Sequence, residues 1–174
     1  TFNWNFSDLF IICISIYLTS RLEKITDKVS AAKEKNLPSS FWYTMREDYN
    51  TVVQLVRLFD NTIGGLIFMS FANNLLFICA QLLHTLAHMF ENIHPIYFMY
   101  SFVFLLARSL AVSLTAARVH AASVEPAYSL YSVSTPSYCI EIERFIDQIQ
   151  GSNVSLSGLQ FFSVKRGLIL TVII

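Results

Sequence analysis

Four apolar stretches, separated by polar segments, set the pattern of the chain. The first covers 6–20, the second 63–83 and the third 96–117, and the fourth begins near Leu159 and continues to Ile174. A helix needs about 20 predominantly apolar residues to cross a bilayer. We therefore expect an all-α membrane protein whose segments, in order, are a transmembrane helix at 1–20, cytoplasmic helices at 21–62, a transmembrane helix at 63–88, an extracellular loop at 89–95, a transmembrane helix at 96–120, a cytoplasmic loop and helix at 121–158, and the start of a last transmembrane helix at 159–174.

Two segments carry apolar residues at alternating steps of three and four, which is the spacing of a coiled-coil seam. The first seam comprises Leu18, Leu22, Ile25, Val29 and Ala32, and the second comprises Met45, Tyr49, Val52, Val56, Phe59 and Ile63. The second pattern continues into the next apolar stretch, so we expect one helix from about Phe41 to His88. At 1.5 Å per residue this helix would be roughly 70 Å long and would extend well beyond the bilayer.

A shorter amphipathic helix is expected within "TPSYCIEIERFIDQIQG". Thr135 would be its N-cap, Pro136 its first residue and Gly151 its end. Its apolar face comprises Ile142, Phe145, Ile146 and Ile149. Such a helix lies either on the membrane surface or against the two seam helices. We favour the second arrangement, because the apolar face has no basic flank.

The basic residues set the orientation in the membrane. Seven of them fall between the first two apolar stretches: Arg21, Lys24, Lys28, Lys33, Lys35, Arg46 and Arg57. The segment between the second and third stretches has none. The positive-inside rule therefore places the segment between the first two stretches in the cytoplasm and the segment between the second and third stretches outside the cell. The chain is 54% hydrophobic and 14% charged with a net charge of +0, and it has no basic face for a nucleic acid.

Four segments together resemble the insect gustatory receptors, in particular their sugar-receptor branch: "WNFSDLFII", "SFANNLLFICAQL", "LARSLAVSLTAARVH" and "YCIEIERFIDQIQGSNVSLSGLQFFSVKRGLIL". The resemblance covers nearly the whole chain. It implies a subunit of a seven-transmembrane, sugar-gated, non-selective cation channel in the plasma membrane of gustatory sensory neurons, assembled as a homo- or hetero-tetramer with related subunits. It also implies a cytoplasmic helical anchor domain, no enzymatic activity, no cofactor and no metal. We expect the chain to be a C-terminal fragment that contains the fourth to sixth transmembrane helices and the start of the pore-lining seventh.

A sugar site needs aromatic faces and hydrogen-bonding groups. In the family resembled, the pocket opens to the extracellular side, and we expect the outer ends of the transmembrane helices to supply it. The candidates are Trp4, Asp8, Gln81, Tyr97 and Tyr100. Each aromatic residue has an alternative role in the belt at the membrane interface.

Arg108 lies in the middle of an apolar stretch, roughly 18 Å along the helix from Ile96 at 1.5 Å per residue. Asn74 and its neighbour Asn73 lie at a similar depth on the preceding transmembrane helix. We therefore expect Arg108 to donate to these amides as a structural or gating tie. Snorkelling of Arg108 to the cytoplasmic face is the alternative.

Two other functions fit parts of the pattern. A polytopic transporter would also hold a small polar solute at membrane depth, but such proteins show broken helices and internal repeats. A membrane-embedded metalloenzyme rests only on His84, His88, Glu91 and His94, whose spacing is compatible with zinc. The sugar-gated channel remains our leading expectation.

Overall fold

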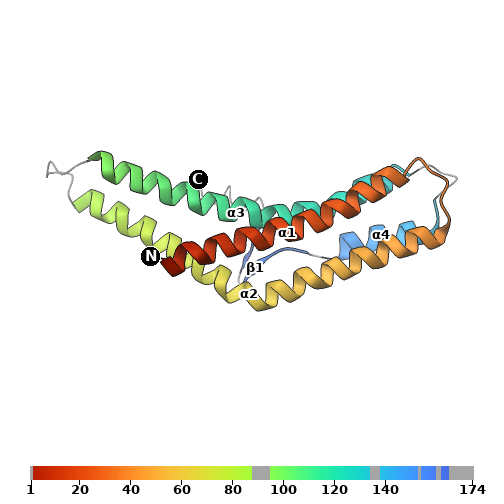
Figure 1. Cartoon of the computed structure of the whole chain (residues 1–174), viewed down its shortest axis with the longest axis horizontal. Helices are drawn as coiled ribbons and strands as arrows, with labels where there is room; N and C mark the ends of the chain where they lie inside the picture. The colour runs from red at the N-terminus through yellow and green to blue at the C-terminus, as the bar shows by residue number, and fades with distance from the viewer. Residues whose placement is uncertain (1, 88–94, 134–137, 153, 160–161, 165–174) are drawn as a thin grey trace.

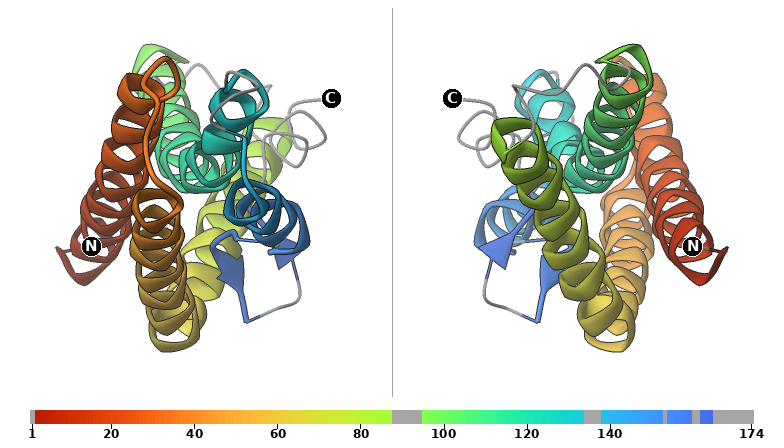
Figure 2. Two further views of the ribbon diagram at one scale, coloured as in Figure 1. Left: turned by 90° about the vertical axis from the view of Figure 1, so that its right-hand side faces the viewer. Right: turned by 90° about the vertical axis from the view of Figure 1, so that its left-hand side faces the viewer.

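The computed structural model describes residues 2–87, 95–133, 138–152, 154–159 and 162–164, and describes only the backbone of 2–4, 84–87, 95–98 and 162. The described chain is almost entirely helical, as expected. Its elements are α1 (Phe2–Ala32), α2 (Ser39–Ala87), α3 (Pro95–Tyr131), α4 (Ile140–Gly151), β1 (Ser157–Gly158) and β2 (Phe162–Ser163). The two strands are antiparallel, with Ser157 opposite Ser163. The three long helices follow the long axis of the molecule, and α4 and the strands lie on one side of them (Figures 1 and 2).

Within the described residues, two helices are long and apolar enough to cross a membrane. They are α2, over Ser39–Leu83, and α3, over Met99–Tyr131. Only 17% and 28% of their most apolar windows are buried inside the chain, whereas the core helix of a soluble protein would be mostly buried. The exposed side chains include Leu75, Leu76, Phe77, Val103 and Phe104. Such apolar surface matches a lipid environment.

The first predicted seam is confirmed, but its main partner differs from the one expected. Leu18, Leu22, Ile25, Val29 and Ala32 are all buried. α1 packs most extensively against α3 and less extensively against α2, the helix that carries the second seam. Most of the buried residues of α3 that share this core have small side chains, among them Ala116, Ala117 and Ala122. Small side chains allow two helices to approach closely along their length.

The long helix expected from Phe41 to His88 is confirmed as α2, which starts and ends within two residues of those bounds. Its seam is shifted in one place, because Val53 is buried whereas Val52 is only half-buried. α2 contacts α1, α3 and α4, so its buried face is wider than a single seam. Figure 1 shows that α2 bends near residues 60–65. Gly64 and Gly65 lie in this stretch, and glycine is a common cause of helix bending.

α3 is longer than expected. We predicted a cytoplasmic loop after residue 120, but the helix continues through Pro126 to Tyr131. A proline inside a helix lacks the backbone donor for the carbonyl four residues earlier and costs about 3 kcal/mol. Burial of Ala127 and Leu130 beyond the proline offsets this cost.

α4 has the predicted apolar face, but it begins later than expected. Its N-cap is Cys139 and its first residue is Ile140, while the predicted cap, Thr135, lies outside the described residues. Ile142, Phe145, Ile146 and Ile149 are buried. The helix docks on α2, as favoured from the sequence, and also on α3 in place of α1.

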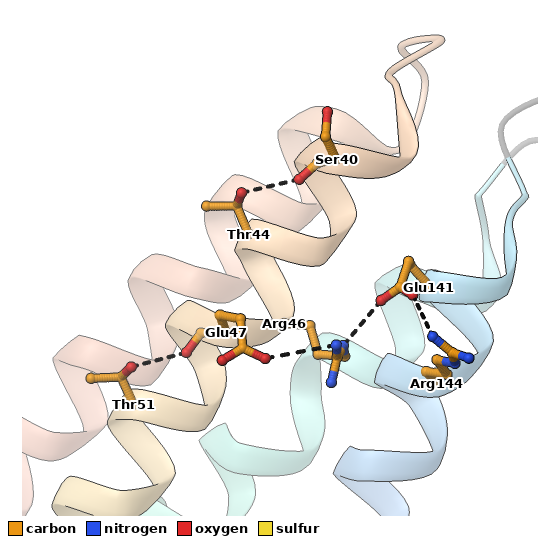
Figure 3. A network of polar contacts seen from close by, with 7 residues as sticks. All are labelled: Ser40, Thr44, Arg46, Glu47, Thr51, Glu141 and Arg144. Carbon is orange, nitrogen blue, oxygen red and sulfur yellow. Dashed lines mark hydrogen bonds and ion pairs between the residues drawn. The ribbon is translucent and has the colours of Figure 1, made fainter.

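Polar contacts secure this docking. Arg46 on α2 donates from Nε to Glu141 Oε2 on α4 at 3.2 Å, and Glu141 also accepts from Arg144 (Figure 3). The ring of Tyr49 packs against that of Phe145 in a tilted arrangement, with centroids 5.4 Å apart, and its hydroxyl donates to the carbonyl oxygen of Ser123 on α3 at 3.0 Å. Burial raises the pKa of the Tyr49 hydroxyl above 10.0, so this group remains a donor.

The final described segment differs from the prediction. We expected a transmembrane helix to begin near Leu159, but Ser157–Gly158 and Phe162–Ser163 pair as strands and Leu159 has a φ of 52°. The helix therefore does not begin at Leu159. Residues 165–174, which carry most of the expected helix, lie outside the described part of the chain.

Candidate functional site

A polar cluster joins the three long helices at the level of Arg108. Arg108 on α3 donates from Nε to Asp8 Oδ2 on α1 at 2.5 Å. Its Nη1 donates to the side-chain oxygen of Asn5, one turn earlier on α1. The hydroxyl of Ser70 on α2 donates to the other carboxylate oxygen of Asp8. We call Asn5, Asp8, Ser70 and Arg108 the central polar cluster.

Most of the central polar cluster is shielded from solvent, although Asn5 is exposed. The side chains of Asp8 and Arg108 are only 4% and 15% exposed, and Ser70 is buried. Arg108 follows the first residue of α3, Pro95, by roughly 20 Å at 1.5 Å per residue. An isolated charge at such a depth in a bilayer is costly, and ion pairing with further hydrogen bonds reduces that cost. The cluster therefore ties α1, α2 and α3 together with its opposite charges paired.

The partner of Arg108 differs from the one expected from sequence. The predicted acceptor, the side-chain oxygen of Asn74, is buried and accepts no hydrogen bond from any described residue. The guanidinium instead faces α1, because α1 packs against α3 and presents a carboxylate there. Asn74 lies one turn beyond Ser70 on α2 and is 3% exposed, whereas Asn73 is half-buried. The side chain of Arg108 is also largely buried and paired with Asp8, so it does not snorkel to the cytoplasmic face as the alternative prediction required.

Asp8 lies further from the start of α3 than the predicted sugar site requires. We expected it at the outer membrane face beside Tyr97 and Tyr100, but its partner Arg108 lies roughly 12 Å along α3 from Tyr100 at 1.5 Å per residue. Both of its carboxylate oxygens are engaged within the chain. Asp8 therefore lies away from Tyr100, and the side chain of Tyr97 lies outside the described part of the chain.

Of the remaining predicted residues, Gln81 lies near the end of α2 and Tyr97 and Tyr100 lie near the start of α3, whereas Trp4 directly precedes Asn5 of the central polar cluster. Gln81 on α2 donates from Nε2 to Ser101 Oγ on α3 at 2.8 Å, which forms a second polar contact between these helices. The side chain of Tyr100 is exposed. Trp4 lies in the first turn of α1 and Tyr97 near the start of α3, but their side chains lie outside the described part.

Sequence analysis missed two members of the central polar cluster, Asn5 and Ser70. The spacing carried a signal for each, since Asn5 precedes Asp8 by three residues and Ser70 precedes Asn74 by four, so each pair shares a helix face. The histidine cluster considered for zinc falls outside the described side chains. Among the described residues, no group of three His, Cys, Asp or Glu side chains is placed to hold a metal.

A second contact links the bend of α2 to the two strands. Asp60 accepts from the backbone nitrogen of Ser157 at 2.5 Å and from its hydroxyl at 2.9 Å. One turn further along α2, a Cβ on Gly64 would lie 3.4 Å from the backbone nitrogen of Leu159. The absence of a side chain at Gly64 thus lets the 157–159 segment lie directly on α2.

Comparison with known proteins identifies the family. The profile described as "Trehalose receptor" matches residues 1–173. In Drosophila melanogaster, the gustatory receptor for sugar taste 61a is 37% identical over 95% of this chain and 38% of its own length. The gustatory receptor for sugar taste 64f is 38% identical over 99% of this chain and 37% of its length. The gustatory receptor 5a for trehalose is 34% identical over 98% of this chain and 38% of its length.

These matches agree with the exposed apolar surfaces of α2 and α3 and with the predominantly helical architecture. The chain spans about two fifths of the length of the curated relatives that it matches. It is thus an all-α membrane receptor fragment, and it belongs to the trehalose receptor family of insect gustatory receptors.

Proposed function

We propose that the receptor containing this chain detects sugars and acts as a ligand-gated, non-selective cation channel in the plasma membrane of gustatory sensory neurons. Three of its relatives are named for sugar taste or trehalose, which supports the sugar ligand. Binding and gating make or break no covalent bond, so no catalytic residue or cofactor is required. The subunit would act in a homo- or hetero-tetramer with related receptors.

The observation that carries the proposal is the set of polar contacts between otherwise apolar helices. Gln81 and Ser101 lie nearer the outer ends of α2 and α3, and Arg108 and Ser70 lie deeper. We propose that Gln81, Tyr97 and Tyr100 provide the sugar contacts near the extracellular face, and that Trp4, one turn from Asp8 on α1, provides a deeper contact beside the central polar cluster. The central polar cluster then forms the tie beneath them, and Asp8 acts in that tie and not as the first contact of the ligand.

The contact at the bend of α2 supplies a route from the ligand to the last segment of the chain. A movement of α2 would pass through Asp60 and Gly64 to Ser157 and Leu159, a few residues before the segment that we expect to line the pore. We propose that this contact couples sugar binding to opening.

The test is electrical recording from cells that express the full-length receptor. Trehalose, sucrose and glucose are applied in turn, and at least one should evoke an inward current carried by both sodium and potassium. Gln81→Ala and Tyr100→Ala should shift the response to higher sugar concentration at unchanged surface expression, by up to about tenfold for one neutral hydrogen bond. Leu76→Ala, which alters an exposed apolar residue on α2, is the matched control. Sugar uptake without any current would overturn the channel in favour of a transporter.

A further inference from the structure

A small cavity lies between α1 and α3, about two turns beyond the central polar cluster. It has a volume of about 80 Å³ and is lined by Ile16, Thr19, Ser20, Glu23, Thr115 and Arg118. Thr115 follows Pro95 by roughly 30 Å at 1.5 Å per residue, which equals the thickness of the hydrocarbon core. With the orientation proposed above, the cavity therefore lies at the boundary between the inner leaflet and the cytoplasm.

The lining changes from apolar to polar in the direction of the cytoplasm. Ile16, on the membrane side, is 54% exposed. Thr19 follows one turn later, and its buried hydroxyl has no hydrogen-bond partner among the described residues. The last turn brings Glu23 on α1 opposite Arg118 on α3, with Oε1 3.6 Å from Nη2 and side chains 47% and 62% exposed. The cavity thus has an apolar entrance, an unused hydroxyl donor and two opposite charges side by side.

These features match a zwitterionic lipid headgroup. The Arg118 guanidinium and a hydroxyl donor suit the oxygens of a phosphate. The Glu23 carboxylate suits an ammonium group that can donate hydrogen bonds, as a primary ammonium does and a trimethylammonium does not. A cavity of about 150 Å³ holds benzene. The present one has about half that volume. It therefore suits ethanolamine, which has fewer non-hydrogen atoms than benzene, better than choline, which has more.

We propose that this cavity binds the headgroup of a phosphatidylethanolamine from the inner leaflet. The phosphate lies against Arg118 and the Thr19 hydroxyl, the ammonium lies against Glu23, and the acyl chains run along Ile16 into the bilayer. A lipid so placed would bridge α1 and α3 at their cytoplasmic ends. The site depends on the proposed membrane orientation, but it does not depend on the sugar or on ion conduction.

The experiment uses the full-length receptor in nanodiscs that contain equal amounts of phosphatidylethanolamine, phosphatidylcholine and phosphatidylglycerol. Native mass spectrometry without sugar measures which lipid remains bound. The wild type should retain phosphatidylethanolamine in preference to the other two. Arg118→Gln and Glu23→Gln should each weaken its retention by about ten- to a hundred-fold, the change expected from losing a hydrogen bond to a charged group.

Controls separate the site from general charge and folding effects. Lys24→Gln and Asp27→Asn alter exposed charges of α1 that do not line the cavity, and they should leave lipid retention unchanged. Thr19→Val keeps the shape of a buried residue whose hydroxyl is unpaired, so it should weaken retention without lowering thermal stability. Size-exclusion profiles check that every variant is folded.

Two results would overturn the site: equal retention of phosphatidylethanolamine and phosphatidylcholine by the wild type, or unchanged retention in both charge variants. Excess soluble glycerophosphoethanolamine carries the same headgroup and should compete with the lipid; a complete failure to compete would show that the cavity does not recognise the headgroup. A receptor that retains the lipid but gives no sugar-evoked current would contradict the proposed function and leave the lipid site standing. A receptor that gives a sugar-evoked current but does not retain the lipid would contradict the lipid site and leave the proposed function standing.

Discussion

Removing either charge of the buried Asp8–Arg108 pair should destabilise the receptor strongly. The two side chains are 4% and 15% exposed, and the Oδ2–Nε distance is 2.5 Å. With charge centres about 4 Å apart and an effective dielectric constant of about 20, their attraction is about 4 kcal/mol. Breaking a buried pair by removing one partner costs about 3–5 kcal/mol, because the other charge remains buried without compensation.

The two single variants should differ in severity. After Asp8→Ala, the long side chain of Arg108 keeps its contact with Asn5 and can extend its head toward the membrane surface. After Arg108→Ala, the short side chain of Asp8 stays in place and keeps its hydrogen bond from Ser70. We therefore expect Arg108→Ala to be the more harmful change. Arg108→Lys should rescue only part of the loss, because an ammonium cannot reproduce two directed contacts from one planar group.

A double-mutant cycle isolates the pair. The full-length receptor, fused to a fluorescent protein, is solubilised and heated, and the folded fraction is followed by size-exclusion chromatography. The Asp8→Ala/Arg108→Ala variant should lose less than the sum of the two singles, with a coupling energy near the upper end of about 0.5–3 kcal/mol. Lys28→Ala and Asp48→Ala form the control cycle, since that pair is 3.8 Å apart and 58% and 48% exposed. Its coupling should be below about 1 kcal/mol.

Additive losses at Asp8 and Arg108 would refute the reasoning, since they would show that the two residues do not depend on each other. A coupling energy no larger than that of the exposed Lys28–Asp48 pair would also refute it. A wild-type melting curve for Arg108→Ala would show that the guanidinium is not buried in the membrane.

Three further predictions address the rest of the chain. Gly64→Ala should be tolerated, since its Cβ would make ordinary contacts, whereas Gly64→Leu should displace the 157–159 segment and reduce sugar-evoked current at normal expression. Normal current from Gly64→Leu would argue against coupling through this contact. Tyr49→Phe should cost about 0.5–1.5 kcal/mol in the same melting assay by removing one hydrogen bond, and an unchanged melting curve would show that the bond contributes nothing. A tag within 31–36 should be reached only from the cytoplasm and one at Glu91 only from outside; the reverse labelling would contradict the orientation.

The helices and their buried faces were largely readable from the sequence. The seam from Leu18 to Ala32, the continuous helix across residues 41–88 and the apolar face of α4 were all predicted from spacing. This is possible because an apolar residue at every third or fourth position forms a stripe along a helix, whatever that stripe packs against. The family was also recognisable from residue motifs.

The partners of those faces were decided only by tertiary structure. Spacing places Arg108 at a given depth on α3, but it does not indicate which neighbouring helix it faces. The sequence offered Asn74 on α2 and Asp8 on α1 as possible acceptors for Arg108. The close packing of α1 on α3 made Asp8 the acceptor. The extension of α3 past Pro126 depends in the same way on burial of Ala127 and Leu130, because contacts distant in sequence offset a local cost.

The cavity beside Glu23 and Arg118 likewise combines features that the sequence predicts with a contact that depends on packing. The sequence by itself determined that each of these residues follows an apolar stretch, at a position where charged side chains end a transmembrane helix. Only the packing of α1 on α3 brought the two charges within 3.6 Å of each other beside an unpaired hydroxyl. Local pattern thus predicts where each helix would enter the membrane. The juxtaposition of groups 95 positions apart depended on how two helix surfaces fit together, which no local pattern encodes.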